Sequence, residues 1–306
     1  MALLSCCQQG TGAHNITEKT MKKDIQTEVT DRIIEALETS TAPWHKPWKS
    51  GATGYPLRST GQAYRGINVL LLWLASDKAG YSSDYWFTYK QAQEFGGQVR
   101  KGEKSTGIVY YNTLEKENEE TEEIERIPFL KQYRVFNADQ IADLPEKFYA
   151  RPIDQGARPI ADFERFFNST GCKRQTGLAA FYTPATDVIT MPAIETFACP
   201  QAYYGTLAHE LTHWTGATHR LDRFGKVFKG TKDYAFEELI AEIGSCFVSA
   251  EIGALPDFEQ SAAYLKHWIK HLKDDKKFIF KAAAAAQRAA DYIMECSAVE
   301  DEKLVA

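Results

Sequence analysis

The motif that most constrains this chain is His209-Glu210-Leu211-Thr212-His213. Two histidines four residues apart lie on one face of an α-helix, about 40° apart around its axis, so their imidazoles can bind one zinc ion. Glu210 is then placed beside the open coordination position of the metal, where it can take a proton from water. The motif predicts a helix that supplies two metal ligands, with Glu210 as the catalytic general base.

A catalytic zinc site needs a third protein ligand, and the sequence offers three candidates. His219 completes an HExxHxxGxxH pattern, but the methionine-bearing turn that should accompany this pattern is missing, because Met294 lies in a helical segment. Glu238 and Glu242 share one face of a strongly apolar helix, where buried carboxylates need partners. We favour Glu238 as the ligand and Glu242 as the hydrogen-bond partner of a ligand histidine. His219 and Glu242 remain alternative ligands.

Charge and composition exclude several classes of protein. The 306 residues suffice for two ordinary domains, and 36 basic against 41 acidic residues give a net charge of −5. A protein that coats nucleic acid through its overall charge is therefore disfavoured. The longest apolar run, Val69–Ala75, is too short to span a bilayer, so we expect no membrane partner. Six scattered cysteines without a CxxC spacing are typical of a reducing compartment, and we expect a cytoplasmic location.

The segment 40–112 differs from the rest of the chain. It carries nine basic and four acidic residues, thirteen aromatic residues and four of the six tryptophans. Cations interleaved with aromatic rings suit single-stranded nucleic acid, because bases stack on the rings while cations follow the phosphates. The competing interpretation is that most of these rings belong to the core. The candidate DNA contacts are Trp44, Lys46, Trp48, Lys49, Arg65, Arg100, Lys101 and Lys104.

Hydrophobic periodicity and turn signals predict an α+β protein of two domains. We expect a disordered leader over residues 1–21, a first domain over 22–145, a linker over 146–159 and a second, mainly helical domain with a small sheet over 160–300. The acidic stretch Glu115–Glu125 is typical of a solvent-exposed hairpin tip or loop. Strands are expected at 108–111, 133–136, 178–182 and 188–191, and helices at 24–39, 66–78, 88–95, 160–168, 202–214, 234–252, 258–272 and 276–294.

Ordered motifs between residues 22 and 297 resemble the ArdC-type antirestriction proteins of conjugative plasmids. The N-terminal marks include Pro43-Trp44-x-x-Pro47-Trp48, Gly61-x-x-Tyr64-Arg65-Gly66-Ile67-Asn68 and Trp86-x-Thr88-Tyr89-x-Gln91. The C-terminal marks are Asp187-x-Ile189-x-Met191-Pro192, the His209–Gly216 stretch with Arg220-Leu221, and Tyr234-Ala-x-Glu237-Glu238-Leu-x-Ala-Glu242.

This resemblance implies a single-stranded-DNA-binding domain followed by a zincin-like metallopeptidase domain, and a role in shielding incoming plasmid DNA from host restriction. It implies one divalent metal, Zn²⁺ or alternatively Mn²⁺, on His209, His213 and Glu238, and a possible host protein as substrate. The alternative is a DNA-binding antirestriction protein whose metal domain is only a scaffold. A free peptidase whose aromatic domain binds peptide is a third hypothesis.

Overall fold

The computed structural model describes residues 24–39, 54–117, 124–149, 160–224, 231–252 and 262–305. The expected leader, and the expected DNA contacts Trp44, Lys46, Trp48 and Lys49, lie outside these residues. The described helices include none with both the length and the apolar composition needed to cross a membrane.

The N-terminal half is built around one sheet of four strands in the order β1-β2-β5-β4. The strands β1 and β2 are parallel, and β5 runs antiparallel to both β2 and β4. A second, two-stranded sheet pairs β3 with β6. The elements in chain order are α1 (Ile25–Glu38), β1 (Leu57–Arg58), α2 (Ile67–Ala79), β2 (Tyr85–Phe87), α3 (Tyr89–Glu94), β3 (Gln98–Val99), β4 (Thr106–Glu117), β5 (Ile124–Asn137) and β6 (Ile141–Ala142).

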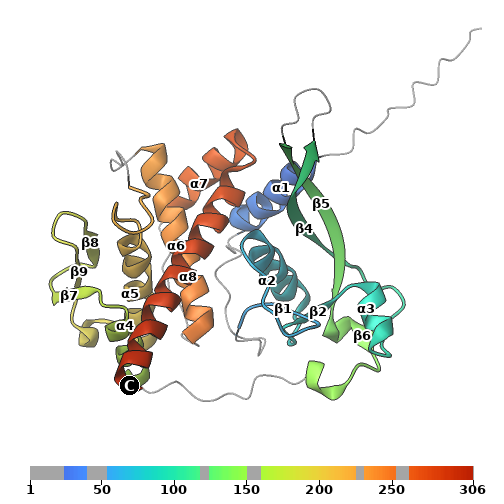
Figure 1. The fold of residues 1–306 in the computed structure, drawn as a ribbon, viewed down its shortest axis with the longest axis horizontal. Helices are drawn as coiled ribbons and strands as arrows, with labels where there is room; N and C mark the ends of the chain where they lie inside the picture. The colour runs from blue at the N-terminus through green and yellow to red at the C-terminus, as the bar shows by residue number, and fades with distance from the viewer. Residues whose placement is uncertain are drawn as a thin grey trace, which may run out of the picture.

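The strands β4 and β5 form a long two-stranded ribbon that extends beyond the rest of the sheet (Figure 1). Their pairing runs as far as Glu117 and Ile124, as expected for a hairpin whose tip falls in the acidic stretch. One face of the ribbon packs on the helices, where Val109 is buried with Val29 of α1 and Leu71 of α2. The side chain of Asn68 fixes this contact, since it both donates to and accepts from the backbone of Val109.

The C-terminal half is mainly helical and carries a three-stranded sheet in the order β7-β9-β8. Its elements are α4 (Ile160–Ser169), β7 (Lys173–Thr176), β8 (Phe181–Thr183), β9 (Val188–Met191), α5 (Pro200–Trp214), α6 (Lys232–Ile252), α7 (Ala262–Asp274) and α8 (Phe278–Val305). The expected strand at 178–182 begins too early, because Leu178 is fully exposed in the connection between β7 and β8. The strand β7 was missed, because its sequence Lys-Arg-Gln-Thr lacks an apolar alternation.

The helices α5 and α6 approach each other closely at Gly244. A Cβ atom added there would lie 2.6 Å from the Cγ2 methyl of Thr212, which lies between the two motif histidines. Glycine therefore permits the backbone of α6 to approach the segment of α5 that carries the HExxH motif. This close approach sets the distance across which side chains of α5 and α6 face each other.

The two halves share one hydrophobic core. Trp73 of α2 meets Phe247 of α6 edge to face with ring centroids 5.8 Å apart, and both belong to a buried cluster that includes Ala286 of α8. Figure 1 shows α1 and α2 on one side of the helices α6–α8 and the three-stranded sheet on the other. The expected linker start at residue 146 is wrong, because Phe148 is 2% exposed and packs on Phe87. The N-terminal half thus extends to Tyr149, the last described residue before 160.

Candidate metal centre

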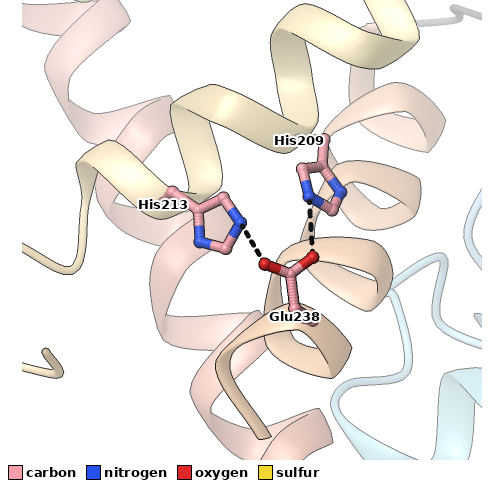
Figure 2. A group of neighbouring side chains, drawn as sticks. All are labelled: His209, His213 and Glu238. Carbon is pink, nitrogen blue, oxygen red and sulfur yellow. Dashed lines mark ion pairs between the residues drawn. The ribbon is translucent and has the colours of Figure 1, made fainter. Parts of the chain in front are cut away.

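The two motif histidines project from α5 toward a single carboxylate on α6 (Figure 2). The Nε2 atom of His209 lies 3.7 Å from one oxygen of Glu238, and the Nε2 atom of His213 lies 3.6 Å from the other. Ligand atoms from these three side chains all lie within 4.8 Å of one another. The α-helical spacing expected for the motif therefore brings both imidazoles to one point.

These residues fit a divalent metal. Two ligands of a tetrahedral zinc ion, each about 2.0–2.1 Å from it, lie about 3.4 Å apart, which is close to the separations found here. The side chains of His209, His213 and Glu238 are only 13–17% exposed. Glu210, Glu237 and Glu242 are also buried nearby on these helices, and one guanidinium, from Arg223, faces Glu237. Such an excess of buried negative charge favours a bound cation.

The remaining ring nitrogens of both histidines also face carboxylates. The Nδ1 atom of His209 lies 3.6 Å from Glu242, and the Nδ1 atom of His213 lies 3.2 Å from Glu237. Carboxylates that accept from the far nitrogen of a ligand histidine fix its tautomer and orientation and raise its basicity. Glu242 occupies the position expected for such a partner, on His209.

Glu237 was not anticipated in this role. Arg223 holds it with two hydrogen bonds, of 3.0 Å from Nε and 2.8 Å from Nη2, and also donates to the carbonyl of Thr212 and the hydroxyl of Thr215. Arg223 thereby ties the end of α5 to the start of α6 and orients the carboxylate on His213. The one signal in the sequence was a third acid in the Glu237–Glu242 stretch, and nothing in the sequence paired it with an arginine 14 residues earlier.

Electrostatic coupling across the site shifts several pKa values. Burial alone would lower the pKa of His209, but Glu238 and Glu242 outweigh burial and hold that pKa well above its usual value. Burial would raise the pKa of Glu238, and the two histidines outweigh it, so the pKa of Glu238 is lowered. The pKa of Glu237 is lowered in the same way, with His213 and Arg223 overcoming the effect of burial. The lowered pKa values show that Glu237 and Glu238 are stabilised in their ionised form by the positive charge that faces them.

Neither alternative third ligand belongs to the group of converging ligand atoms. The side chain of His219 is 63% exposed, and its Nε2 lies 3.6 Å from Asp187, at the turn between β8 and β9. His219 is thus outside the group of converging ligand atoms. Glu242 contacts His209 through Nδ1, the nitrogen that faces away from Glu238. Glu210 is 8% exposed and lies on α5 between the two histidines, and its role as general base stays a prediction.

The candidate DNA contacts that lie among the described residues differ in their surroundings. Arg65 is paired with Asp291 of α8 and so joins the two halves of the protein. Arg100 binds the carbonyl of Asp139 and lies 3.6 Å from Glu103. Lys101 and Lys104 are exposed in the turn before β4 and have no ion pair among the described residues. Arg65 and Arg100 therefore have structural partners, whereas the two lysines remain available.

Comparison with known proteins assigns both halves. A family model of the N-terminal domain of anti-restriction factor ArdC matches residues 23–136, and a zincin-like metallopeptidase model matches residues 161–285. The chain is 38% identical over 295 residues to a DNA primase TraC of Escherichia coli, and 37% identical over 300 residues to a second one. It spans 20% and 27%, respectively, of the length of these primases.

Other relatives match over nearly their whole length. The uncharacterized protein y4eC of Sinorhizobium fredii is 36% identical over 287 residues, which cover 88% of this chain and 91% of y4eC. Crystal structures of the antirestriction protein ArdC from plasmid R388 cover 90% of this chain and 99% of theirs. The metal-free one is 53% identical with a TM-score of 0.80, and the Mn(II)-bound one is 51% identical with a TM-score of 0.77. The chain therefore belongs to the ArdC family of antirestriction proteins.

Proposed function

We propose that this protein binds single-stranded DNA and carries a metal-dependent, peptidase-like site that helps to protect incoming plasmid DNA from host restriction in the cytoplasm. Membership of the antirestriction family supports the biological role. The convergence of His209, His213 and Glu238 is the observation that carries the enzymatic part. A host protein is the proposed substrate, since the site is of the kind that hydrolyses peptide bonds.

The residues present suit a divalent metal held by His209, His213 and Glu238. A metal bound there would act as a Lewis acid that polarises a peptide carbonyl and lowers the pKa of a water molecule. Two imidazoles and one carboxylate are a typical zinc set, and we propose Zn²⁺ as the resident ion. The Mn(II)-bound structure of the R388 relative makes Mn²⁺ the alternative.

Each protein group then has a separate task. Glu210 accepts the proton of the attacking water and returns it to the leaving amine, as a general base and then a general acid. Glu242 and Glu237 hold the two imidazoles in the orientation in which Nε2 faces Glu238. Arg223 keeps Glu237 ionised and in place.

Substitution of Glu210 by glutamine tests the peptidase proposal. E210Q keeps the shape of the side chain but cannot accept a proton, so peptide hydrolysis should fall by about 10²–10⁴-fold. Plasmid transfer into a restricting recipient, relative to a non-restricting one, should fall to the level without the protein. Metal content should stay that of the wild type, and E195Q, at an exposed glutamate outside the site, should behave as wild type. Full protection by E210Q would exclude the peptidase mechanism.

That last outcome would favour the second candidate function, a DNA-binding antirestriction protein with a structural metal domain. The specific observation in its favour is the low exposure of the three ligand side chains, 13–17%, which restricts the approach of a folded substrate. Metal content separates the ligand assignments: E238A should lose the ion, whereas H219A should keep it.

A further inference from the structure

The outward face of the β4–β5 ribbon carries a group of aromatic rings with a lysine among them. We call Tyr110, Phe129, Lys131 and Tyr133 the ribbon platform. In the antiparallel register Tyr110 is opposite Lys131, Tyr133 is opposite Ile108, and Phe129 is opposite Asn112. Because side chains two residues apart, and directly opposite residues, share a face, all four platform residues lie on one side of the ribbon.

The rings of the platform contact one another, and the two tyrosines are exposed while Phe129 is partly buried. The ring centroid of Tyr110 lies 5.8 Å from that of Tyr133 and 6.4 Å from that of Phe129. Tyr110 is 44% and Tyr133 45% exposed. Large aromatic side chains usually bury most of their surface, so two adjacent half-exposed tyrosines are a candidate binding surface.

The opposite face of the ribbon holds the platform in place. Val109, next to Tyr110, is buried against α1 and α2, and Gln132, next to Tyr133, donates to Glu28 of α1. Figure 1 shows α1 and α2 on one side of the ribbon. On the platform side, Ile108 and Val135 at the base of the ribbon are buried in the main core, and Tyr110 and Tyr133 lie at the edge of this buried part. The rings are therefore presented by a strand pair that is already fixed, so binding orders little new structure.

Charge indicates which ligand the platform suits. The Nζ atom of Lys131 lies 5.1 Å from the ring centroid of Phe129, and Lys131 makes no ion pair with any described residue. Lys101 and Lys104 lie just before the start of β4. In sequence, the stretch Glu115–Glu125 carries seven acids and one lysine, so the sequence favours an anionic ligand near Lys101, Lys104 and Lys131 rather than near this stretch.

We propose that the ribbon platform is a stacking site for the bases of single-stranded DNA, with Lys131 contacting the phosphates. This inference rests on the proposed function and assigns its DNA contacts to a different surface from the one expected from sequence. Aromatic residues on adjacent strands of a sheet are a general way to hold unpaired bases. Paired bases in a duplex do not offer their faces to such rings, so the platform selects single strands.

The first test measures the affinity of the full-length protein for a fluorescent oligothymidylate of about 16 nucleotides, the upper size of a single compact site. The variant Y110A/Y133A should bind roughly 30-fold or more weakly, since each stacked ring contributes about a 5- to 150-fold factor. Y110F/Y133F keeps the rings and should bind within about threefold of wild type. K131Q should reduce the slope of affinity against salt by about 0.7.

The matched control is Tyr111, an adjacent aromatic residue that is 65% exposed on the other face of the ribbon. Y111A should leave affinity unchanged. If wild type fails to bind the oligothymidylate, the DNA-binding function itself is wrong. If wild type binds and Y110A/Y133A binds equally well, only the platform assignment is wrong.

A second test needs no substitution. Photocrosslinking of wild-type protein to an oligonucleotide with 5-iododeoxyuridine, followed by peptide mapping, should place crosslinks on Tyr110, Phe129 or Tyr133. Crosslinks confined to residues outside β4 and β5 would overturn the proposal. Self-association through this face would show as a change in molar mass between wild type and Y110A/Y133A without DNA, and that result would also count against it.

Discussion

The metal centre buries charged side chains, which usually lie at the surface. The ribbon platform exposes aromatic side chains, which are usually buried. The metal centre places carboxylates inside the protein: Glu237 has a fixed counter-charge in Arg223, and Glu238 and Glu242 face histidines. The ribbon platform places aromatic rings at the surface, where Tyr110 contacts the rings of Tyr133 and Phe129. Buried charge must be compensated for the chain to fold, whereas exposed rings can be removed at little cost to stability. Damage to the first region should therefore change metal affinity and stability, and damage to the second should change binding alone.

Among residues that neither bind the metal nor act as the general base, the largest expected effect comes from separating Glu237 from its partners. In E237Q the side chain loses the charge that orients His213 and compensates Arg223, so Zn²⁺ affinity should fall by about 10–100-fold. Competition with a chelating dye measures this affinity. D233N, at an exposed acid in the first turn of the same helix, is the control and should bind zinc normally. Equal zinc affinities in E237Q and wild type would mean that the Glu237–His213 contact has no role in metal binding.

A smaller effect is expected where α5 and α6 touch. G244A places a methyl group 2.6 Å from Cγ2 of Thr212 and should lower the free energy of unfolding by about 1–3 kcal/mol. T212S removes that methyl and keeps the hydroxyl that donates to the carbonyl of Ala208. The double variant should therefore recover much of the loss in urea unfolding. Strictly additive losses would show that the two helices do not touch at this point.

The smallest effect should come from the ribbon platform. Y110T replaces one strand-favouring residue by another and should change the free energy of unfolding by less than about 0.5 kcal/mol, as at most exposed positions. V109A, one residue away on the buried face, should lower it by about 2 kcal/mol. Urea unfolding of both variants measures this contrast. A large loss of unfolding free energy in Y110T would mean that the platform stabilises the fold. The platform would then not differ from the metal centre in this respect.

The sequence allowed prediction of those features that depend on local spacing. The HExxH motif requires only that residues 209–213 be helical, and α5 contains them all. The helices α2 and α3 lie within one or two residues of their expected bounds, because Gly66, Thr88 and Gly96 mark their ends. Convergence of Glu238 with the two histidines followed from placing acids on an apolar helix.

Features that depend on tertiary contact could not be predicted in this way. Arg65 belongs to a basic and aromatic segment, yet its partner Asp291 lies 226 residues away in sequence. Tyr133 sits in an expected strand, but its exposure depends on which face of the ribbon α1 and α2 cover. The linker start was placed too early because Pro145 reads as a boundary, while Phe148 returns to the N-terminal core.

The common core of the two halves has a consequence for how such chains are inherited. With Trp73 seated against Phe247, neither half could be passed to another gene alone without exposing an apolar surface to water. A TraC primase several times longer matches this chain over 295 residues that include both halves. The shared core gives a physical reason for the two halves to occur together in that relative, although two separate family models describe them.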